Sequence, residues 1–242
     1  MEHIKLLKEV YYMNNDFRYR HELKYDINYS MYLSLRSRLR QIMYPDEHAA
    51  SDGKYLIRSI YFDNYRDKAL QEKLCGNSKH EKFRIRWYND DLSFIRLEKK
   101  QKINGLCIKI DADWSETELK CFIDGDYSWM LTHPCPLTQE LYVKMKTDQL
   151  VPIVIVSYLR ESFIYDAGNI RITFDTDIRS TPYSVSFISK SVMDIGVTNE
   201  PGHVILEIKY DEFLPDIISC MIQLDNCRQI AYSKYSVSRS FG

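Results

Sequence analysis

The chain has 242 residues, 45% of them hydrophobic, and a formal net charge of −1. This length fits one large domain or two small ones, and the composition is that of a globular protein. The near-zero net charge excludes a global attraction to nucleic acid or to an anionic membrane, so an anion site must come from local sorting of charge. With no internal repeat and no clear boundary, we predict a single domain over residues 1–242.

The N-terminal segment lacks the apolar core of a secretory signal, and no stretch approaches the roughly eighteen apolar residues of a membrane span. The six cysteines are scattered and form no C-x-x-C pair, which is typical of reduced, mostly structural thiols. Cys220 and Cys227 lie on an expected helix and are predicted to face its core side. We therefore expect a cytoplasmic protein.

Residue patterning predicts these elements in the first half: a strand at 17–27, a helix at 29–42, a strand at 54–62, a helix ending near Gly76, and strands at 81–89, 92–100 and 106–113. The first helix carries its apolar stripe at Leu35, Leu39 and Ile42. Asp63 or Asn64 is placed to cap the second helix.

The second half is predicted to contain a short helix behind the capping box Ser115-x-x-Glu118, a helix at 138–149, strands at 152–165 and 169–175 joined by a hairpin turn, one or two strands at 183–195, a strand at 203–210, and a helix from Pro215 to about 229. The tail from Ser233 is expected to be irregular. Several strands are joined by short turns, so antiparallel pairing should dominate.

Charged residues recur two positions apart on the expected strands, among apolar and aromatic neighbours. Side chains with this spacing point to the same side of a strand. The residues that share a face in this way are Glu22 and Lys24, Arg84 and Arg86, Glu98 and Lys100, Arg171 and Asp175, Glu207 and Lys209, and Tyr158 and Arg160. An ordinary antiparallel sheet with one solvated face would give the same pattern.

The other interpretation is an α+β fold built on an antiparallel β-barrel, or tunnel, of about eight strands. Its charged residues would line the lumen, and helices would pack around its apolar outside. Clustered cations need anions to neutralise them, and phosphate oxygens suit both the Arg fork and the Lys point charge. The carboxylates could hold a divalent ion that completes its shell with phosphate oxygens and water. The chain has no P-loop and no kinase signature, and its histidines show no ligand spacing.

Eight short motifs together resemble the VTC (vacuolar transporter chaperone) catalytic domain, a branch of the CYTH or triphosphate tunnel metalloenzyme superfamily. In chain order they are HELKY, SIYFD, KFRIRWY, LEKK, SYLRESF, RITFD, LEIKY and SKY, and they span about residues 17–236. The resemblance implies an antiparallel β tunnel that moves the terminal phosphate of ATP onto a growing polyphosphate chain. It also implies help from Mn²⁺ or Mg²⁺ and a polymer that threads through the tunnel.

The resemblance and the charged strands together give three sets of expected site residues. The catalytic set is Lys24, Arg84, Arg86, Lys100 and Arg160. The set expected to bind phosphate or substrate is Tyr158, Lys109, Arg171, Lys209, Ser233 and Lys234. The set expected to bind the metal is Glu207, Glu22 and Glu98.

Two alternatives to the polymerase stay open at this point: a tunnel triphosphatase that hydrolyses tripolyphosphate or a nucleoside triphosphate, and a polyphosphate-binding module without activity. Superfamily triphosphatases usually begin with an E-x-E-x-K strand, whereas here Arg20 stands in place of the first glutamate, which favours the polymerase. Glu207 argues against a pure binding module. The chain lacks the regulatory SPX domain and the membrane segments of eukaryotic members, so we expect no regulation by inositol pyrophosphates. A membrane partner and the oligomeric state are left open.

Overall fold

The computed structural model describes residues 20–46, 49–50, 52–103, 106–183, 195–196, 202–224 and 227–240. Its strands are β1 (His21–Ile27), β2 (Tyr44–Pro45), β3 (Lys54–Asp63), β4 (Lys79–Tyr88), β5 (Asp91–Ile103), β6 (Leu106–Trp114), β7 (Val151–Tyr165), β8 (Ile170–Pro182), β9 (Ile195–Gly196) and β10 (Val204–Tyr210). Its helices are α2 (Tyr29–Leu39), α3 (Lys68–Leu74), α4 (Glu116–Ile123), η1 (Ser128–Leu131), α5 (Pro136–Thr147), α6 (Asp216–Ile222) and α7 (Lys234–Ser240).

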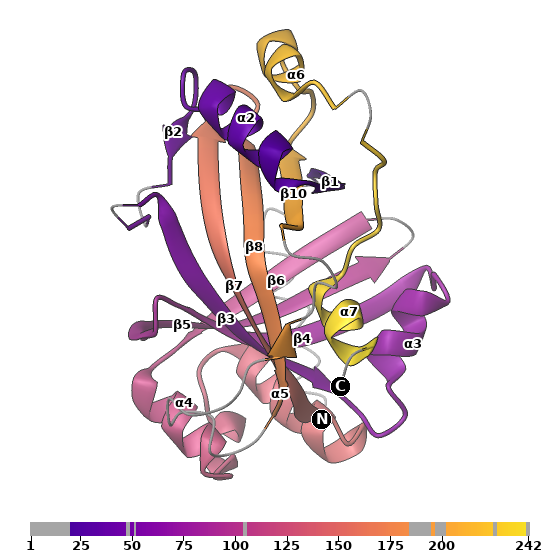
Figure 1. Ribbon diagram of the computed structural model, residues 1–242. Helices are drawn as coiled ribbons and strands as arrows, with labels where there is room; N and C mark the ends of the chain where they lie inside the picture. The colour runs from indigo at the N-terminus through magenta and orange to yellow at the C-terminus, as the bar shows by residue number, and fades with distance from the viewer. Residues whose placement is uncertain are drawn as a thin grey trace.

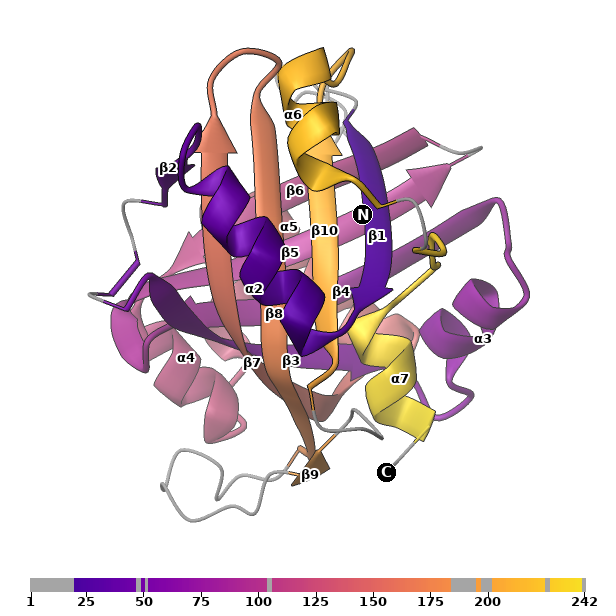
Figure 2. The ribbon, with the colours of Figure 1, turned by 45° about the horizontal axis from the view of Figure 1, so that its top comes forward.

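The strands form one strongly curled antiparallel sheet in the order β1-β10-β8-β7-β3-β4-β5-β6. In Figure 2, β1, β10, β8 and β7 run side by side, and β4, β5 and β6 cross behind them. The long ladder between β7 and β3 joins these two halves, which curl toward each other about a shared inner face. The predicted α+β tunnel fold of about eight long strands is thereby confirmed.

Helices cover the outer face of each half, because the outward residues of the strands are apolar. Leu206 and Ile208 of β10 pack with Leu35 beneath α2 and α6, whereas Ile85 and Leu97 pack under α4 and α5. Figure 1 shows α2 and α6 at the top of the molecule and α4 and α5 at the bottom. Since side chains alternate along a strand, the charged residues between these apolar ones face inward.

A third apolar cluster lies on the inner face itself, along β3 and β7. Tyr55, Ile57, Val156 and Tyr158 belong to it, and Tyr235 of α7 packs against them. Helix α7 therefore covers part of the inner face, next to α3 (Figure 1). The inner face thus has an apolar floor where the two halves join and charged walls on either side.

Local sequence signals place several of the elements. The predicted capping box at Ser115 is present, with Ser115 Oγ accepting from the Glu118 N–H. Both predicted caps of α3 contribute, since Asp63 accepts from the N–H groups of Ala69 and Leu70, and Asn64 accepts from that of Lys68. The predicted hairpin between β7 and β8 closes through the N–H of Asn169 and the carbonyl oxygen of Asp166, 3.0 Å apart.

Three predictions about the C-terminal part are wrong. The helix that begins after Pro215 ends at Ile222, so Cys227 lies outside it, and Cys220 is exposed instead of facing the core. The tail after Ser233 is helical instead of irregular, because α7 gains tertiary contacts that a local pattern cannot show. The prediction of one or two strands at 183–195 is not tested, because 184–194 lie outside the described residues. Across the described part of the chain, no helix combines the length and apolarity that a membrane span requires.

Candidate functional site

The charged side chains of β1 and β10 alternate in sign across their ladder. Lys24 lies opposite Glu207, and Glu22 lies opposite Lys209. Lys24 Nζ lies 2.7 Å from Glu22 Oε1 and 3.8 Å from Glu207 Oε2, and Lys209 also pairs with Glu207. Burial alone would raise the pKa of Glu207, but Lys209 and Lys24 outweigh burial and hold it well below its usual range. This wall therefore presents ionised carboxylates between ammonium groups.

The opposite wall, made by β4, β5 and β6, is organised around Glu98. Arg84 Nε donates to Glu98 Oε2, and Lys109 Nζ lies 2.9 Å from Glu98 Oε1. Arg84 also donates from Nη1 to the Tyr61 hydroxyl at 3.2 Å. Burial would raise the pKa of Tyr61, but Arg84 and Arg86 lower it to about 8. The field on this wall is therefore strongly positive despite the buried carboxylate.

Arg160, Asp175 and Lys234 meet on the floor between the walls. Arg160 donates to both oxygens of Asp175, at 2.6 and 2.8 Å, and Lys234 Nζ pairs with the same carboxylate. Lys234 Nζ also lies 4.5 Å from the ring centroid of Tyr158, whose hydroxyl accepts from Arg86 at 3.1 Å. This network connects β7, β8, α7 and β4 and fixes its cations in position.

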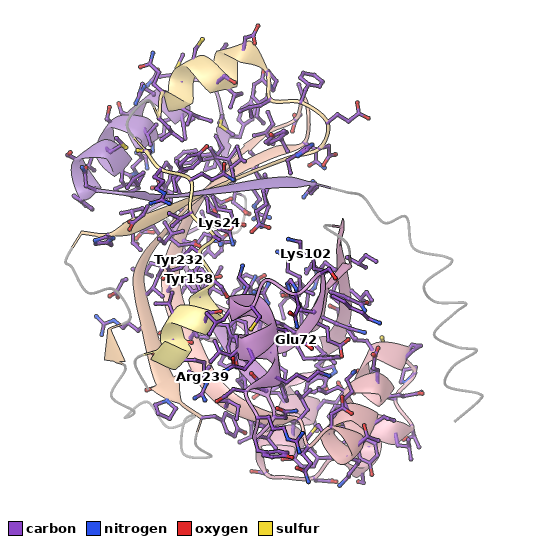
Figure 3. All side chains as sticks on the ribbon, turned by 90° about the vertical axis from the view of Figure 1, so that its right-hand side faces the viewer. Lys24, Glu72, Lys102, Tyr158, Tyr232 and Arg239 are labelled. Atoms are coloured by element: carbon purple, nitrogen blue, oxygen red, sulfur yellow. The ribbon has the colours of Figure 1, made fainter. Side chains whose placement is uncertain are left out.

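The segment before α7 ties the floor to both walls. Lys24 Nζ donates to the Tyr232 carbonyl oxygen at 3.2 Å, and Lys82 Nζ lies 3.4 Å from Ser233 Oγ. The Tyr235 hydroxyl donates to Asp63 at the end of β3. In Figure 3, Lys24 and Lys102 lie across from each other on the two halves, with Tyr158 and Tyr232 close to Lys24. Ser233 and its neighbours are thereby held against the inner face.

The VTC domain family model matches residues 19–241, nearly the whole chain. The chain belongs to the VTC domain family. A comparison with curated proteins finds no match.

Two solved structures are similar to this VTC domain at low sequence identity. A Bacillus halodurans protein described as a candidate adenylate cyclase has a TM-score of 0.52 and 15% identity, covering 93% of this chain and 98% of its own. The PH1819 protein of Pyrococcus horikoshii has a TM-score of 0.47 and 14% identity, covering 93% of this chain and 100% of its own. At such identities the first likeness shows the shared fold alone.

The VTC domain brings the site residues predicted from the sequence onto one inner face. From the strands these are Glu22, Lys24, Arg84, Arg86, Glu98, Lys100, Lys109, Tyr158, Arg160, Arg171, Glu207 and Lys209, and from the C-terminal segment Ser233 and Lys234. Arg171 lies apart from the network of Arg160, Asp175 and Lys234. It is near the start of β8, where it contacts Asp46, Ser162 and Tyr55. The roles of these residues remain predictions.

Sequence reasoning missed Lys82, although Lys82, Arg84 and Arg86 alternate along one strand and share its inner face. Burial is the main cause that lowers the pKa of Lys82, to about 8, and the neighbouring Lys73 and Lys100 lower it further. Lys73 on α3 could not be placed from the sequence, since only the fold brings this helix to the tunnel. Its pKa is also lowered, first by burial and then by nearby lysines of the strands.

The three carboxylates predicted to bind a metal do not form one group. Glu22 and Glu207 both contact Lys24, whereas Glu98 is held by Arg84 and Lys109 on the opposite wall. Among the residues that the structure describes, no set of three or more His, Cys, Asp or Glu side chains gathers as metal ligands. A Mg²⁺ or Mn²⁺ ion bound with phosphate needs only one or two carboxylates, so the ionised pair Glu22 and Glu207 fits this kind of ion.

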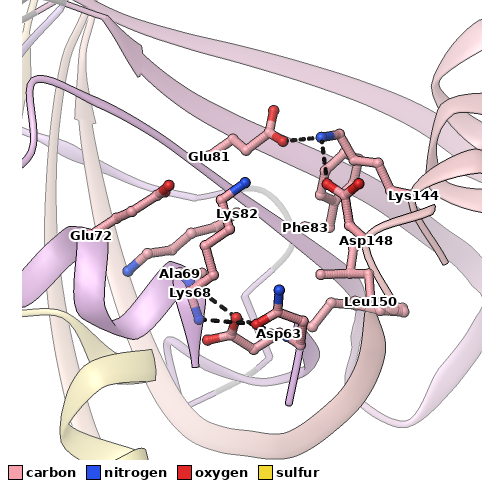
Figure 4. Close-up of a pocket in the computed structure, with 12 residues that line it drawn as sticks. Asp63, Lys68, Ala69, Glu72, Glu81, Lys82, Phe83, Lys144, Asp148 and Leu150 are labelled. Carbon is pink, nitrogen blue, oxygen red and sulfur yellow. Dashed lines mark hydrogen bonds and ion pairs between the residues drawn. The ribbon is translucent and has the colours of Figure 1, made fainter. Parts of the chain in front are cut away.

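Two hollows beside the tunnel, between α3 and α5, are less suited to phosphate. The smaller one is drawn in Figure 4, and the larger one, of about 500 Å³, shares its lining residues Lys68, Glu72, Glu81 and Lys144. Lys144 pairs with Glu81 and Asp148 inside the smaller hollow, and Lys99 Nζ lies 2.8 Å from Glu140 in the larger one. Lys82 also lines the smaller hollow, but it shares the inner face of β4 with Arg84 and Arg86. The tunnel gathers cations from many more strands than either hollow, so it remains the candidate site.

Proposed function

We propose that this VTC-domain protein is a polyphosphate polymerase, which transfers the terminal phosphate of ATP to a growing polyphosphate chain with the help of Mn²⁺ or Mg²⁺. The observation that carries the proposal is a single inner face to which almost every strand of the sheet contributes a cation. Polyphosphate carries negative charge along its whole length, so a site that follows the chain requires cations spread over many strands. A site for one isolated phosphate would need far fewer.

Arg84 and Arg86 are well placed to bind the phosphoryl group that is transferred. Arg86 is oriented by the hydroxyls of Ser59 at 3.2 Å and Tyr158 at 3.1 Å, and Arg84 by Glu98 and Tyr61. Guanidinium groups held in advance need no reorganisation when charge develops on the equatorial oxygens. We assign the positioning of the acceptor chain to Lys24, Lys82 and Lys100 on the walls and to Lys234 on the floor.

Glu207 and Glu22 would hold the divalent ion, together with oxygens of the substrate. Such an ion neutralises charge that builds on the transferring phosphoryl group. The two residues are suited to this because their carboxyls stay ionised. Burial and Glu207 would raise the pKa of Glu22, yet Lys100 and Lys24 lower it to about 2.

The first strand favours chain growth over hydrolysis. Superfamily triphosphatases usually carry E-x-E-x-K in this strand, and Arg20 stands at the position of the first glutamate. Its Nε donates to Asp211 Oδ1 at 2.9 Å. The tunnel therefore has one carboxylate fewer for metal ions and a greater excess of positive charge. Both differences favour a long polyanion over a small, metal-rich triphosphate complex.

The test is incubation of the purified protein with ATP and Mn²⁺, with long-chain polyphosphate, ADP and free phosphate measured together. We expect polymer with a matching amount of ADP and little free phosphate. Free phosphate without polymer would contradict the polymerase and support a tunnel triphosphatase. Neither product, with polyphosphate still bound, would support a binding module.

A further inference from the structure

The curled sheet has two ends, β1 and β6. They come close to each other, because Lys100 of β5, the strand next to β6, reaches Glu22 of β1. Beside Lys24 and Tyr25, β1 is covered by a short segment: Tyr25 bridges to Gln229, and the N–H of Ile230 donates to the Lys24 carbonyl oxygen at 2.9 Å. On β6, the described partner strand is β5. The two ends of the sheet therefore define a long side of the tunnel, opposite the floor on β3 and β7.

Inner side chains on the two edge strands are more exposed than those at the centre of the floor, although Glu98 of β5 is 3% exposed and Arg171 of β8 is 39% exposed. Asp175 on the floor is 0% exposed and Arg160 is 10% exposed. On β1, Lys24 and Glu22 are 21% and 25% exposed. On β6 and β5, Lys109 and Lys100 reach 46% and 54%. Solvent therefore enters the site along the side between β1 and β6, and not through the two mouths alone.

One ion pair crosses this open side. Lys100 Nζ of β5 lies 3.0 Å from Glu22 Oε2 of β1. Because Lys100 is more than half exposed, solvent screens the pair, and the contact is weak. A phosphate oxygen that approaches Lys100 can take the place of Glu22 at little cost.

We propose that the tunnel binds the interior of a polyphosphate chain through this side, so that it also binds chains whose ends are blocked or far away. The inference rests on the proposed function and adds a class of bound polymer to it: internal segments of long linear polyanions, admitted sideways and held first by Lys100 and Lys109. The Lys100–Glu22 pair closes the side when no chain is bound. A protein that only threads its substrate could not accept such chains.

The test uses the wild-type protein and a long polyphosphate coupled to biotin at both ends. Streptavidin on both ends makes each end far wider than a lumen that side chains nearly fill. Association is followed by interferometry on the immobilised protein, with uncapped polyphosphate and streptavidin alone as controls. We expect capped and uncapped chains to associate at rates within about threefold of each other, since neither has to find an end.

The outcomes separate this inference from the proposed function. Binding of the uncapped chain alone would overturn sideways entry and leave the polymerase intact. Binding of neither chain would overturn both. If streptavidin alone binds to the immobilised protein, a bulky dendrimer replaces it as the cap. The association rates of capped and uncapped chains are then compared in the same way.

A pair of variants tests the Lys100–Glu22 contact. Glu22→Gln removes the carboxylate that crosses the open side, whereas Asp113→Asn removes one on the inner face of β6 that pairs with Arg96 at 3.1 Å. Each change removes one negative charge, so general electrostatic steering is matched. We expect the capped chain to associate faster with Glu22→Gln than with Asp113→Asn. Equal rates would overturn the closing role of the pair.

Discussion

At the scale of single residues, we expect Lys82 to bind phosphate at the expense of stability. Its Nζ contacts Ser233 Oγ at 3.4 Å and lies 5.0 Å from the ring centroid of Tyr235. Within the described chain, no carboxylate lies at ion-pair distance from it. Burial lowers its pKa from 10.5 to about 8, so the folded protein disfavours the charge that the lysine carries at neutral pH.

We expect Lys82→Met to raise the free energy of unfolding at pH 7 by about 1–3 kcal/mol and to weaken tripolyphosphate binding. The sign follows from the lowered pKa: the cost of charging Lys82 is fully present below pH 8 and fades as the pH rises toward 10.5. The gain in stability should therefore shrink in alkaline buffer. Denaturant unfolding at pH 7 and pH 10, together with calorimetric binding, measures both effects.

Lys102→Met is the matched control, because Lys102 is an exposed lysine of the neighbouring strand. Its substitution should leave stability within about 0.5 kcal/mol of wild type. If Lys82→Met is less stable than wild type at pH 7, the charge of Lys82 does not destabilise the folded protein, and the prediction is wrong.

Glu207 and Glu98 look equivalent in the sequence, yet their surroundings separate them. Both precede a lysine by two residues on a strand, and both were predicted to bind a metal. Both are buried, but Glu207 shares the contact with Lys24 with a second carboxylate, Glu22, whereas Glu98 is held by Arg84 and Lys109. A local pattern cannot show this difference, because it depends on which strands become neighbours.

We expect Glu207→Gln to raise the concentration of Mn²⁺ needed for half-maximal activity by about 10–100-fold, since a metal-binding carboxylate is lost. Glu98→Gln should lower the maximal rate through Arg84 and leave the metal midpoint unchanged. A metal titration of both variants, with folding checked by circular dichroism, makes the comparison. The same midpoint in Glu207→Gln and wild type would remove Glu207 from the metal site.

At the scale of elements, the sequence predicts strands better than the short C-terminal helices. The strands alternate clearly between apolar and charged residues, so β3, β7 and β10 match their predicted ranges to within one residue at each end. Helix α7 has no comparable signal, because seven residues are too few for a stable helix without tertiary contacts. Its position depends on Asp63 and Asp67, which lie far away in the sequence.

The hydroxyl of Tyr235 fixes α7 to this scaffold. It donates to Asp63, whose carboxylate also accepts from the first turn of α3. We expect Tyr235→Phe to cost about 1–2 kcal/mol, as for a lost hydrogen bond to a buried charged group, and to weaken polyphosphate binding by loosening Ser233 and Lys234. Hydrogen exchange of the α7 amides, together with thermal unfolding, provides the readout.

Tyr232→Phe is the matched control for Tyr235→Phe. The Tyr232 hydroxyl is buried and has no hydrogen-bond partner among the residues that the structure describes, and burial raises its pKa to about 12. Removing it should therefore be neutral or slightly stabilising. Equal losses in the two variants would mean that the aromatic rings, and not the Tyr235–Asp63 bond, hold α7.

The whole molecule separates charge in a way that its composition hides. The net charge is −1, yet cations from nearly every long strand face one inner surface. The sequence revealed the charged pairs, and the family resemblance suggested that they line a tunnel. Neither could show the open side between β1 and β6 or the approach of α3, since both result from the curl of the complete sheet.

This separation of charge predicts a large, salt-dependent stabilisation by polyanions. Repulsion among Lys73, Lys82 and Lys100 opposes folding of the empty tunnel, and a bound chain relieves it. Tripolyphosphate at a hundredfold excess over its Kd should add about 2.7 kcal/mol, which is roughly 5–10 °C in Tm for a domain of this size.

The Tm shift caused by a fixed concentration of tripolyphosphate should fall steeply between 0.1 and 1 M NaCl, because the electrostatic screening length shrinks from about 10 to about 3 Å. Orthophosphate at the same concentration should give a much smaller shift, since it reaches only one group of cations at a time. Thermal scans with each anion at both salt concentrations measure the effect. Equal shifts by the two anions would mean that the inner face binds separate phosphates, and the case for a continuous polyphosphate track would be lost.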